Sequence, residues 1–296
     1  MSQKVNARSM IFTIYGDYIH HYGGKVWVGT LIRLLEAFGH NAQAVRAAIS
    51  RMQKQGWVQA EKRGNRSFYS LTTQGQKRMR EAGKRIFNDV EKEWDGRWRM
   101  LIYSIPEDQR KLRDELRKEL GWSGFGSLTH SCWLTPHRLE DQVQQLSKRY
   151  GIAEYIHFFT GDHQTPERND ELVEKCWDLA AVNERYRQFI DEYSKRFIIT
   201  RNEIKNQKMN REQCFVERTK LVHEYRKFLF IDPELPEPLL PDYWVGDHAS
   251  SLFHEYYEVL AEPANEFFES VYKEDNDAAA SVKRGKGYRE PLSVKE

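Results

Sequence analysis

Three segments near the start of the chain place apolar side chains at intervals of three and four residues, the spacing of one helix face. They are residues 9–20, 30–38 and 41–55. A Gly23–Gly24 turn and a short strand-like run, KVWV, separate the first segment from the second. Only Gly39 and His40 separate the second from the third, so these two helices are predicted to pack at a sharp angle, as in a helix-turn-helix.

The third of these helices is predicted to have two unlike faces. Asn41 lies where a side-chain oxygen can accept from the first-turn amides, and Gly56 marks the end. Its apolar face consists of Val45, Ala48, Ile49 and Met52. Its opposite face consists of Gln43, Ala47, Ser50 and Lys54, with Arg46 and Arg51 at the borders. This second face is small, polar and basic.

Two strand-like runs follow in WVQAEKRGNRSFYSLT, on either side of Gly64 and Asn65. These two residues can supply the positive φ angles that a tight hairpin needs, and Arg63 and Arg66 lie at its tip. The order helix, strand, helix, helix and hairpin predicts a winged helix-turn-helix. A further helix over residues 72–92 is expected to connect it to the rest of the chain.

The middle of the chain predicts alternating strands and helices. RWRMLIYSIP predicts a strand, residues 107–120 a helix, FGSLTHSCWLTP one or two strands, residues 138–150 a helix, and IAEYIHFF a final strand. The order β, α, β, (β), α, β is that of a ferredoxin-like domain. The remaining chain predicts helices over residues 170–197, 210–230 and in ASSLFHEYYEVL, with the proline-rich DPELPEPLLPDYW as an extended loop.

We therefore expect an α+β multidomain protein. The expected parts are a winged-helix domain with its connector helix at 1–92, a ferredoxin-like domain at 93–165, an all-helical domain at 166–274 and a disordered tail at 275–296. The 296 residues, 40% of them hydrophobic, are enough for two or three such domains. No apolar run reaches the length of a membrane span and the first residues do not resemble a signal peptide, so we expect a cytoplasmic protein with no membrane partner.

The net charge of +2 hides a strong difference between the two ends of the chain. The first 90 residues contain 15 Lys and Arg against 5 Asp and Glu, and the last 66 contain 6 against 15. Because only the first part is basic, it is the part expected to bind a polyanion. An alternative is that its basic helix face is an ordinary solvated surface.

A basic helix-turn-helix has a direct physical use, because its second helix fits the major groove of DNA. Gln43 is suited to an adenine edge, Arg46 to a guanine edge or a phosphate, and the small Ala47 leaves room for close approach. The hairpin arginines are placed for phosphates or the minor groove. The complete set of predicted DNA-binding residues is Asn41, Gln43, Arg46, Ser50, Arg51, Lys54, Arg63, Asn65 and Arg66.

Catalytic and metal-binding chemistry is not indicated. Cys132, Cys176 and Cys214 are about 40 residues apart, and the ten histidines form no ligand spacing beyond a loose pair in HASSLFHE. The motifs GxSxG, GxGxxG and the P-loop are absent. We expect no metal, no cofactor and no enzymatic activity.

Five segments resemble the PaaX-type transcriptional repressors. They are ARSMIFTIYGDYI, NAQAVRAAISRMQKQGWV, RGNRSFYSLTTQG, WDGRWRMLIYSIPEDQRKLRDELRKELGWSGFGSLTHSCWLTPH and LPEPLLPDYWVGDHASSLFHEYY, and they span residues 7 to about 260. The resemblance implies a homodimer that blocks a promoter of phenylacetate catabolic genes and is released by phenylacetyl-CoA. It also implies that QAVRAAISRM is the recognition helix, with Gln43, Arg46, Ser50 and Arg51 facing DNA, and that RGNR is the wing.

The same resemblance implies that the ferredoxin-like domain is similar to a small CRISPR adaptation nuclease. That nuclease pattern has an aspartate at the end of the first strand, where this chain has Ser104, so we interpret the domain as a dimerisation domain. Two alternatives stay open: a repressor of the same fold that senses another acyl-CoA or aromatic acid, and a metal-dependent nuclease. The effector-binding residues are not identified by the sequence, although cations within residues 97–230 are the expected contacts for acyl-CoA phosphates.

Overall fold

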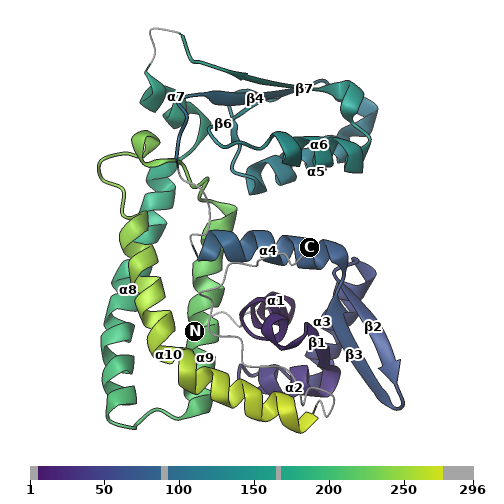
Figure 1. Ribbon diagram of the computed structural model, residues 1–296, viewed down its shortest axis with the longest axis vertical. Helices are drawn as coiled ribbons and strands as arrows, with labels where there is room; N and C mark the ends of the chain where they lie inside the picture. Colours follow the sequence, from purple (N-terminus) through teal and green to yellow (C-terminus); the bar gives the residue numbers. More distant parts are fainter. Residues whose placement is uncertain (1–5, 88–92, 165–167, 276–296) are drawn as a thin grey trace. The chain divides into compact units, whose positions relative to one another are not determined.

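The computed structural model describes residues 6–87, 93–164 and 168–275 of a mixed α/β protein with two compact units (Figure 1). The first unit lies within residues 1–89, 189–226 and 248–296, and the second within residues 90–188 and 227–247. Each unit therefore combines separated stretches of chain. The domain boundaries expected near residues 92, 165 and 274 stay predictions, and residues 276–296 of the expected tail lie outside the described residues.

The first unit begins with the expected elements in the expected order. They are α1 (Ala7–Asp17), the 3₁₀ helix η1 (Ile19–Tyr22), β1 (Lys25–Trp27), α2 (Val28–Glu36), α3 (Ala42–Lys54), β2 (Val58–Arg63), β3 (Arg66–Leu71) and α4 (Thr73–Ile86). The strands form one antiparallel sheet in the order β1-β3-β2. Of the helix expected over residues 72–92, α4 reaches Ile86 and residues 88–92 lie outside the described residues.

Local sequence explains the sharp connection between α2 and α3. Gly39 has a φ of 75°, a left-handed conformation that side chains with a Cβ seldom adopt. Two residues later, Asn41 Oδ1 accepts from the Ala44 amide at 2.8 Å, as predicted for a helix cap. The apolar face of α3 is between 0% and 2% exposed at Val45, Ala48, Ile49 and Met52. Burial of this face fixes which face of α3 points outward.

The hairpin of β2 and β3 turns through two residues. Arg63 pairs with Arg66, so Gly64 and Asn65 form the loop between them. Gly64 has a φ of 56°, whereas Asn65 is not among the residues with positive φ. Positive φ at the first loop residue alone is the pattern of a type II′ turn, so the turn requires the glycine but not the asparagine.

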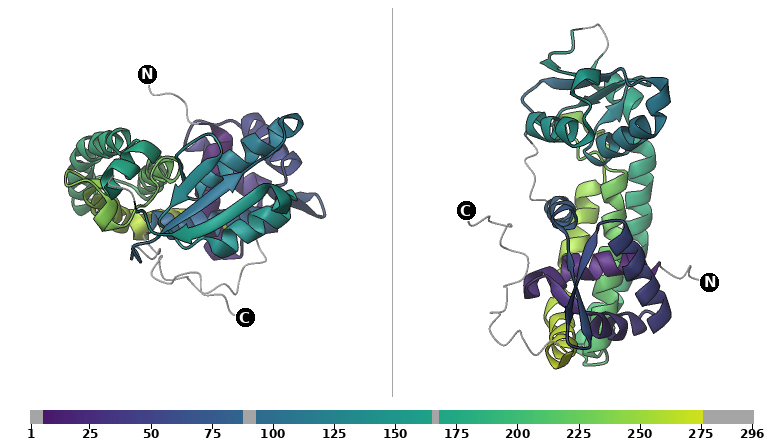
Figure 2. Two further views of the ribbon diagram at one scale, coloured as in Figure 1. Left: turned by 90° about the horizontal axis from the view of Figure 1, so that it is seen from above. Right: turned by 90° about the vertical axis from the view of Figure 1, so that its right-hand side faces the viewer.

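The C-terminal part of the described chain is helical. Its helices are α7 (Asn169–Cys176), α8 (Leu179–Lys205), α9 (Arg211–Tyr225) and α10 (Gly246–Asp275), with 3₁₀ helices η4 (Arg226–Phe230) and η5 (Glu237–Leu239). In the first unit, α8, α9 and α10 lie side by side (Figures 1 and 2). Aromatic rings fill the space between them: Phe253 of α10 stacks on Tyr225 of α9 at 4.0 Å, and Phe189 of α8 lies 5.5 Å from Tyr225.

A buried ion pair joins α1 to α9 in the same unit. Arg218 Nη2 donates to Asp17 Oδ1 at 2.8 Å, and the two side chains are 4% and 1% exposed. The guanidinium also lies 4.8 Å from the Tyr18 ring and 4.1 Å from the Tyr257 ring, and Tyr257 donates to Asp17. Burial lowers the pKa of Arg218, but the charge of Asp17, together with Tyr18, Tyr257 and the hydrogen bond to Asp17, outweighs burial and holds that pKa above its usual value.

Two further contacts hold α1 nearer its N-terminal end. Thr13 Oγ1 lies 3.2 Å from His223 Nδ1, and Arg226 donates to the Ser9 carbonyl at 3.2 Å. Together with the ion pair, these contacts fix one side of α1 to the C-terminal helices. The other side of α1 packs against α2 and α3, so the helix is buried between the N-terminal and C-terminal parts of the first unit.

The second unit contains a four-stranded antiparallel sheet in the order β5-β6-β4-β7. Its elements are β4 (Trp98–Tyr103), the 3₁₀ helix η2 (Glu107–Gln109), α5 (Arg110–Trp122), β5 (Gly126–Ser127), β6 (Cys132–Thr135), α6 (Glu140–Tyr150), the 3₁₀ helix η3 (Ala153–Tyr155) and β7 (Ile156–Gly161). This is the predicted order of strands and helices, with two strands in FGSLTHSCWLTP.

Alternating side chains of β4 supply two separate cores. Leu101 and Tyr103 point to the face that α5 and α6 cover, where they pack with Leu116 and Leu120. Trp98 points to the opposite face, where α7 and residues 235–244 pack against it. Because both faces contribute cores, β4 reads as a nearly continuous apolar run rather than as an alternating one.

The predicted helix over residues 170–197 is wrong as one continuous element. The chain is extended at Trp177, with φ −139° and ψ 140°, and α8 starts anew where Asp178 Oδ1 accepts from the Ala181 amide at 2.9 Å. Apolar spacing continues across this break and therefore conceals it. The prediction for residues 210–230 also needs correction, because α9 ends at Tyr225 and a 3₁₀ helix follows.

The sequence predicted an extended loop for the proline-rich segment, but the segment is not extended throughout. Residues 237–239 form the 3₁₀ helix η5, in which Pro238 occupies the first turn, where its missing amide costs no hydrogen bond. At the other end of this region, α10 continues through Pro263 for 30 residues in all. The predicted helix in ASSLFHEYYEVL is therefore the first half of a longer one.

Replacement of Arg218 by alanine should lower the free energy of unfolding by about 3–5 kcal/mol, because Asp17 would stay buried without its partner. Arg211→Ala is the matched control on the same helix. Arg211 pairs with Glu266 at 2.9 Å but is 68% exposed, so its loss should cost less than about 1 kcal/mol. Chemical denaturation measures both values. Equal losses in the two variants would contradict a structural role for the buried pair.

Candidate nucleic-acid interface

The outward face of α3 brings together five of the predicted residues. Gln43, Arg46, Ser50, Arg51 and Lys54 are all exposed, and at 3.6 residues per turn they fall within an arc of about 140°. Helix α3 carries no acidic residue. Among the described residues, Arg46, Arg51 and Lys54 have no ion-pair or hydrogen-bond partner for their side chains. This face therefore presents three uncompensated positive charges around small polar side chains.

Asn41 lies at the start of this face and is exposed. Its side-chain oxygen is occupied by the Ala44 amide, so the cap is its established structural role. Ala47 is also exposed, near the middle of the face, where its single methyl group leaves the helix backbone accessible. The sequence predicted both features from spacing alone.

Neighbouring side chains hold both predicted arginines of the hairpin. Arg63 Nε donates to Glu61 Oε1 at 2.5 Å, and its guanidinium lies 5.5 Å from the Phe68 ring. Arg66 lies over the ring of Trp27 at 4.7 Å. Both arginines are exposed, as is Asn65 at the tip, but each guanidinium is held against an aromatic ring.

Glu61 reduces the positive charge of the hairpin. Hydrogen bonds from Lys25 and then from Arg63 lower the pKa of its carboxyl group, so the carboxylate stays charged at neutral pH. Glu61 and Arg63 are two residues apart on one strand and therefore share a face of the sheet. The sequence analysis considered only the arginines at the tip and did not predict this neutralisation, although the two-residue spacing of Glu61 and Arg63 is visible in the sequence.

Three further exposed cations were missed by the sequence analysis. Lys62 follows Glu61 on β2, and Arg80 and Lys84 lie four residues apart on α4. Their side chains make no ion pair with the residues that the structure describes. The charge total of the first 90 residues includes them, but a total does not reveal which cations are neutralised by a neighbour.

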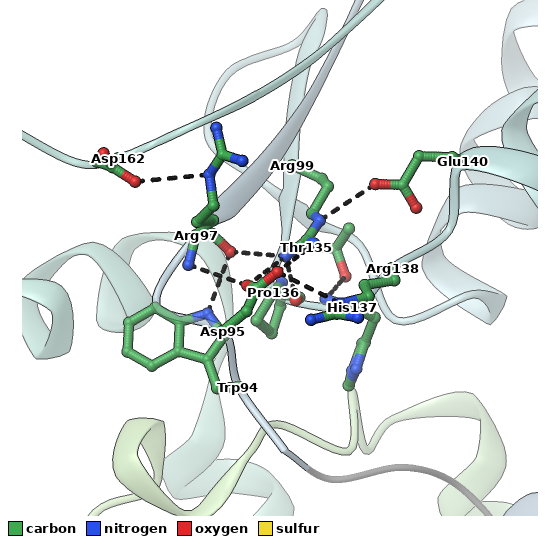
Figure 3. A network of polar contacts seen from close by, with 10 residues as sticks. All are labelled: Trp94, Asp95, Arg97, Arg99, Thr135, Pro136, His137, Arg138, Glu140 and Asp162. Carbon is green, nitrogen blue, oxygen red and sulfur yellow. Dashed lines mark hydrogen bonds and ion pairs between the residues drawn. The ribbon is translucent and has the colours of Figure 1, made fainter.

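A second polar cluster, at the start of β4, is neutral within itself (Figure 3). Arg99 is 4% exposed and donates to both carboxylate oxygens of Asp95, at 2.7 and 2.6 Å. Its remaining donors reach the carbonyls of Arg97 and Pro136 and the carboxylate of Glu140. Hydrogen bonds from Arg99 are the main cause that lowers the pKa of Asp95. This network ties β4 to the loop before α6 and engages each of the three nitrogens of the Arg99 guanidinium.

Ser104 directly follows the last residue of β4, at the position where the nuclease pattern considered in the sequence analysis has an aspartate. Ser104 is exposed, and its backbone amide donates to the Tyr155 carbonyl at 2.8 Å. Asp108 is the second acidic residue after Ser104, and it belongs to η2. Within residues 6–87, 93–164 and 168–275, no group of three His, Cys, Asp or Glu side chains is arranged to hold a metal ion. None of the described helices is long and apolar enough to cross a membrane.

Comparison with known proteins identifies three consecutive family regions. Residues 6–75 match the family described as PaaX-like protein, residues 91–173 the PaaX protein central Cas2-like domain, and residues 177–270 the PaaX-like protein C-terminal domain. The central part of this chain is therefore Cas2-like.

Two individual proteins are similar over most of the chain. The transcriptional repressor PaaX of Escherichia coli K12 is 34% identical over 266 residues, which are 89% of this chain and 83% of that protein. The structure of the uncharacterized protein Rv0674 from Mycobacterium tuberculosis matches with a TM-score of 0.55 and 23% identity, over 89% of this chain and 99% of that one. The second match concerns the fold alone. The family regions and the first match show that this chain belongs to the PaaX family of transcriptional repressors.

Proposed function

We propose that the chain represses transcription by binding operator DNA through α3, with α1 to β3 acting as a winged helix-turn-helix. The order of elements and the β1-β3-β2 sheet support this assignment. The single observation that carries it is the outward face of α3, with three uncompensated cations and no acid. A helix of this kind fits the major groove, which is about 12 Å wide.

In this complex, the exposed methyl group of Ala47 lets α3 approach the bases closely. Gln43 reads a base edge through its amide, Ser50 contacts a base or the backbone, and Arg46 and Arg51 bind guanine edges or phosphates at the borders of the face. Lys54 binds phosphate at the end of the helix. Lys62, Arg63 and Arg66 of the hairpin bind the adjacent DNA backbone, together with Asn65 and Asn41 where their donors are free to reach it.

The protein acts as a homodimer in this proposal, with the central unit as a ferredoxin-like dimerisation domain. The order β4, α5, β5, β6, α6, β7 and the sheet order β5-β6-β4-β7 support that fold. A two-fold dimer places two copies of α3 against two half-sites of the operator, and half-site spacing then follows from the dimer geometry.

The proposed regulon is the phenylacetate catabolic genes, and the proposed inducer is phenylacetyl-CoA. This part is supported by membership of the PaaX family and by the similarity to the transcriptional repressor PaaX of Escherichia coli. Release follows from linkage: the inducer binds a dimer state in which the two α3 helices no longer match their half-sites, so it lowers the affinity for DNA. No residue is assigned to the inducer site.

Arg46→Ala should weaken operator binding by about tenfold or more, because a lost base or phosphate contact is worth about 1–3 kcal/mol. Fluorescence anisotropy over a range of salt concentrations separates the two kinds of contact. Loss of sequence preference marks a base contact, and a uniform loss with a shallower salt slope marks a phosphate contact. Arg185→Ala, on an exposed part of α8, is the control. Unchanged affinity of Arg46→Ala for the operator would remove Arg46 from the proposed interface.

Glu61→Gln should strengthen binding to operator and nonoperator DNA alike, by about threefold or more at low salt, since it frees Lys25 and Arg63 to meet phosphates. Glu258→Gln, at an exposed position of α10, changes the net charge equally and should have little effect. The same binding assay compares them. Similar increases for both variants would mean that Glu61 acts only through total charge.

Phenylacetyl-CoA should release the protein from its promoter, whereas free phenylacetate and unrelated thioesters should not. Titration of a protein–promoter complex with each compound measures this difference. Release by another acyl-CoA or by an aromatic acid, with no effect of phenylacetyl-CoA, would favour a same-fold repressor of different specificity. DNA binding itself would stand in that case.

A further inference from the structure

Strand β7 is an open edge of the sheet in the second unit. In the order β5-β6-β4-β7, it pairs with β4 on one side, and no strand within residues 6–87, 93–164 and 168–275 pairs with it on the other. The opposite edge, β5, is only two residues long, and its Gly126 lies directly against Cys176 and Trp177 at the end of α7. In the part of the chain that the structure describes, the sheet therefore has one covered edge at β5 and one open edge at β7.

The hydrogen bonds at the end of β4 show which groups of β7 face outward. Ser104 donates to the Tyr155 carbonyl, and this pair continues the register in which Tyr103 lies opposite Ile156. Bonded and non-bonded pairs alternate along an antiparallel ladder, so His157, Phe159 and Gly161 bond to β4. The main-chain N–H and C=O groups of Ile156, Phe158 and Thr160 consequently point to the open edge.

This edge has none of the usual protection against pairing. Natural edge strands carry lysine, proline or a bulge that prevents association. The sequence of β7, IHFFTG, contains no charged residue and no proline, and its pairing with β4 is regular over all six residues. Phe159 is also 52% exposed, on the sheet face opposite α5 and α6. A six-residue edge with an exposed aromatic ring is a template for another strand.

We propose that β7 pairs antiparallel with β7 of a second copy of this chain and joins two four-stranded sheets into one. This inference rests on the homodimer of the proposed function and names the surface that forms it. The strand is self-complementary, because two antiparallel copies bring no like charges opposite each other within the paired residues. Phe158 of one copy exchanges main-chain hydrogen bonds with Thr160 of the other, and the two Phe159 rings lie side by side across the two-fold axis.

The flanking charges select this register. Centring the pair on Phe158 instead would place Asp162 of one copy opposite Glu154 of the other, and like charges directly opposite are destabilising. Centring on Phe159 places Asp162 beside Ile156 of the other copy. The Phe159 pair then occupies a non-hydrogen-bonded position, where Cα atoms are about 4.5 Å apart and side chains contact most closely.

The test compares Thr160→Pro with Thr160→Val in the full-length protein by sedimentation equilibrium. Proline removes an amide that points to the open edge and spares the bonds to β4, whereas valine keeps the amide. The wild type and Thr160→Val should sediment at twice the chain mass of 35.2 kDa, and Thr160→Pro should dissociate at a concentration about tenfold higher or more. A monomeric wild type, or equal dissociation of the two variants, would overturn the proposal.

Phe159→Cys tests the register of the β7 pair without a measurement of dimer dissociation. Mild oxidation should cross-link this variant into a covalent dimer, because the two introduced thiols face each other across the axis. Thr129→Cys, exposed beyond β5, should not cross-link. Failure of Phe159→Cys to cross-link under conditions where the protein is dimeric would contradict this pairing. Binding of each variant to a single operator half-site reports on α3 separately, so a failed dimer surface and a failed DNA-binding function are distinguishable.

Discussion

Arg218 lies 201 residues from Asp17 in the chain, and its guanidinium donates to that carboxylate inside the first unit. A buried ion pair loses much of its Coulombic energy to desolvation, so its main effect is to exclude arrangements that leave either charge without a partner. Tyr18 and Tyr257 enclose the guanidinium, and Asn265 accepts from its other nitrogen at 2.9 Å. These contacts hold α1 against α9 and α10, although Asp17 Oδ2 and Arg218 Nε have no hydrogen-bond partner among the described residues.

A few direct contacts connect this ion pair to the proposed DNA-binding face. Helix α1 packs against α2 and α3, and Tyr15 of α1 donates to the Tyr69 carbonyl of β3 at 2.9 Å. Tyr272 of α10 donates to the Lys25 carbonyl at 2.7 Å, which adds a second connection to the same sheet. The elements that carry α3 and the hairpin are thus held by the C-terminal helices. A ligand that shifts α9 or α10 has a mechanical route to α3.

The features that the sequence analysis predicted correctly are those that depend on residues near one another in the chain. The cap at Asn41, the buried face around Val45 and Ile49, the Gly64 turn and the succession of strands and helices along the central unit are all marked by residues close together in the chain. The break at Trp177 was missed because apolar spacing continues across it, and only the cap formed by Asp178 distinguishes two helices from one. The pairing of Arg218 with Asp17 was beyond reach, since nothing in either neighbourhood indicates the other.

The candidate site was likewise predictable from the sequence only in part. Which residues of α3 face outward follows from a 3.6-residue repeat, and the structure has all of them exposed. Which cations remain uncompensated depends on neighbours in space, as Glu61 and the rings of Trp27 and Phe68 illustrate at the hairpin. Three uncompensated cations therefore lie on α3, and three more are Lys62 on β2 and Arg80 and Lys84 on α4.

The central claim is that α3 occupies the major groove of an operator as one half of a symmetric pair. Methylation protection tests it most directly, because dimethyl sulfate reacts with guanine N7, which lies in that groove. The account predicts two clusters of protected guanines, separated by a whole number of helical turns and lost in the Arg46→Ala complex. Binding at the promoter with no protected guanine N7 in either half-site would contradict it.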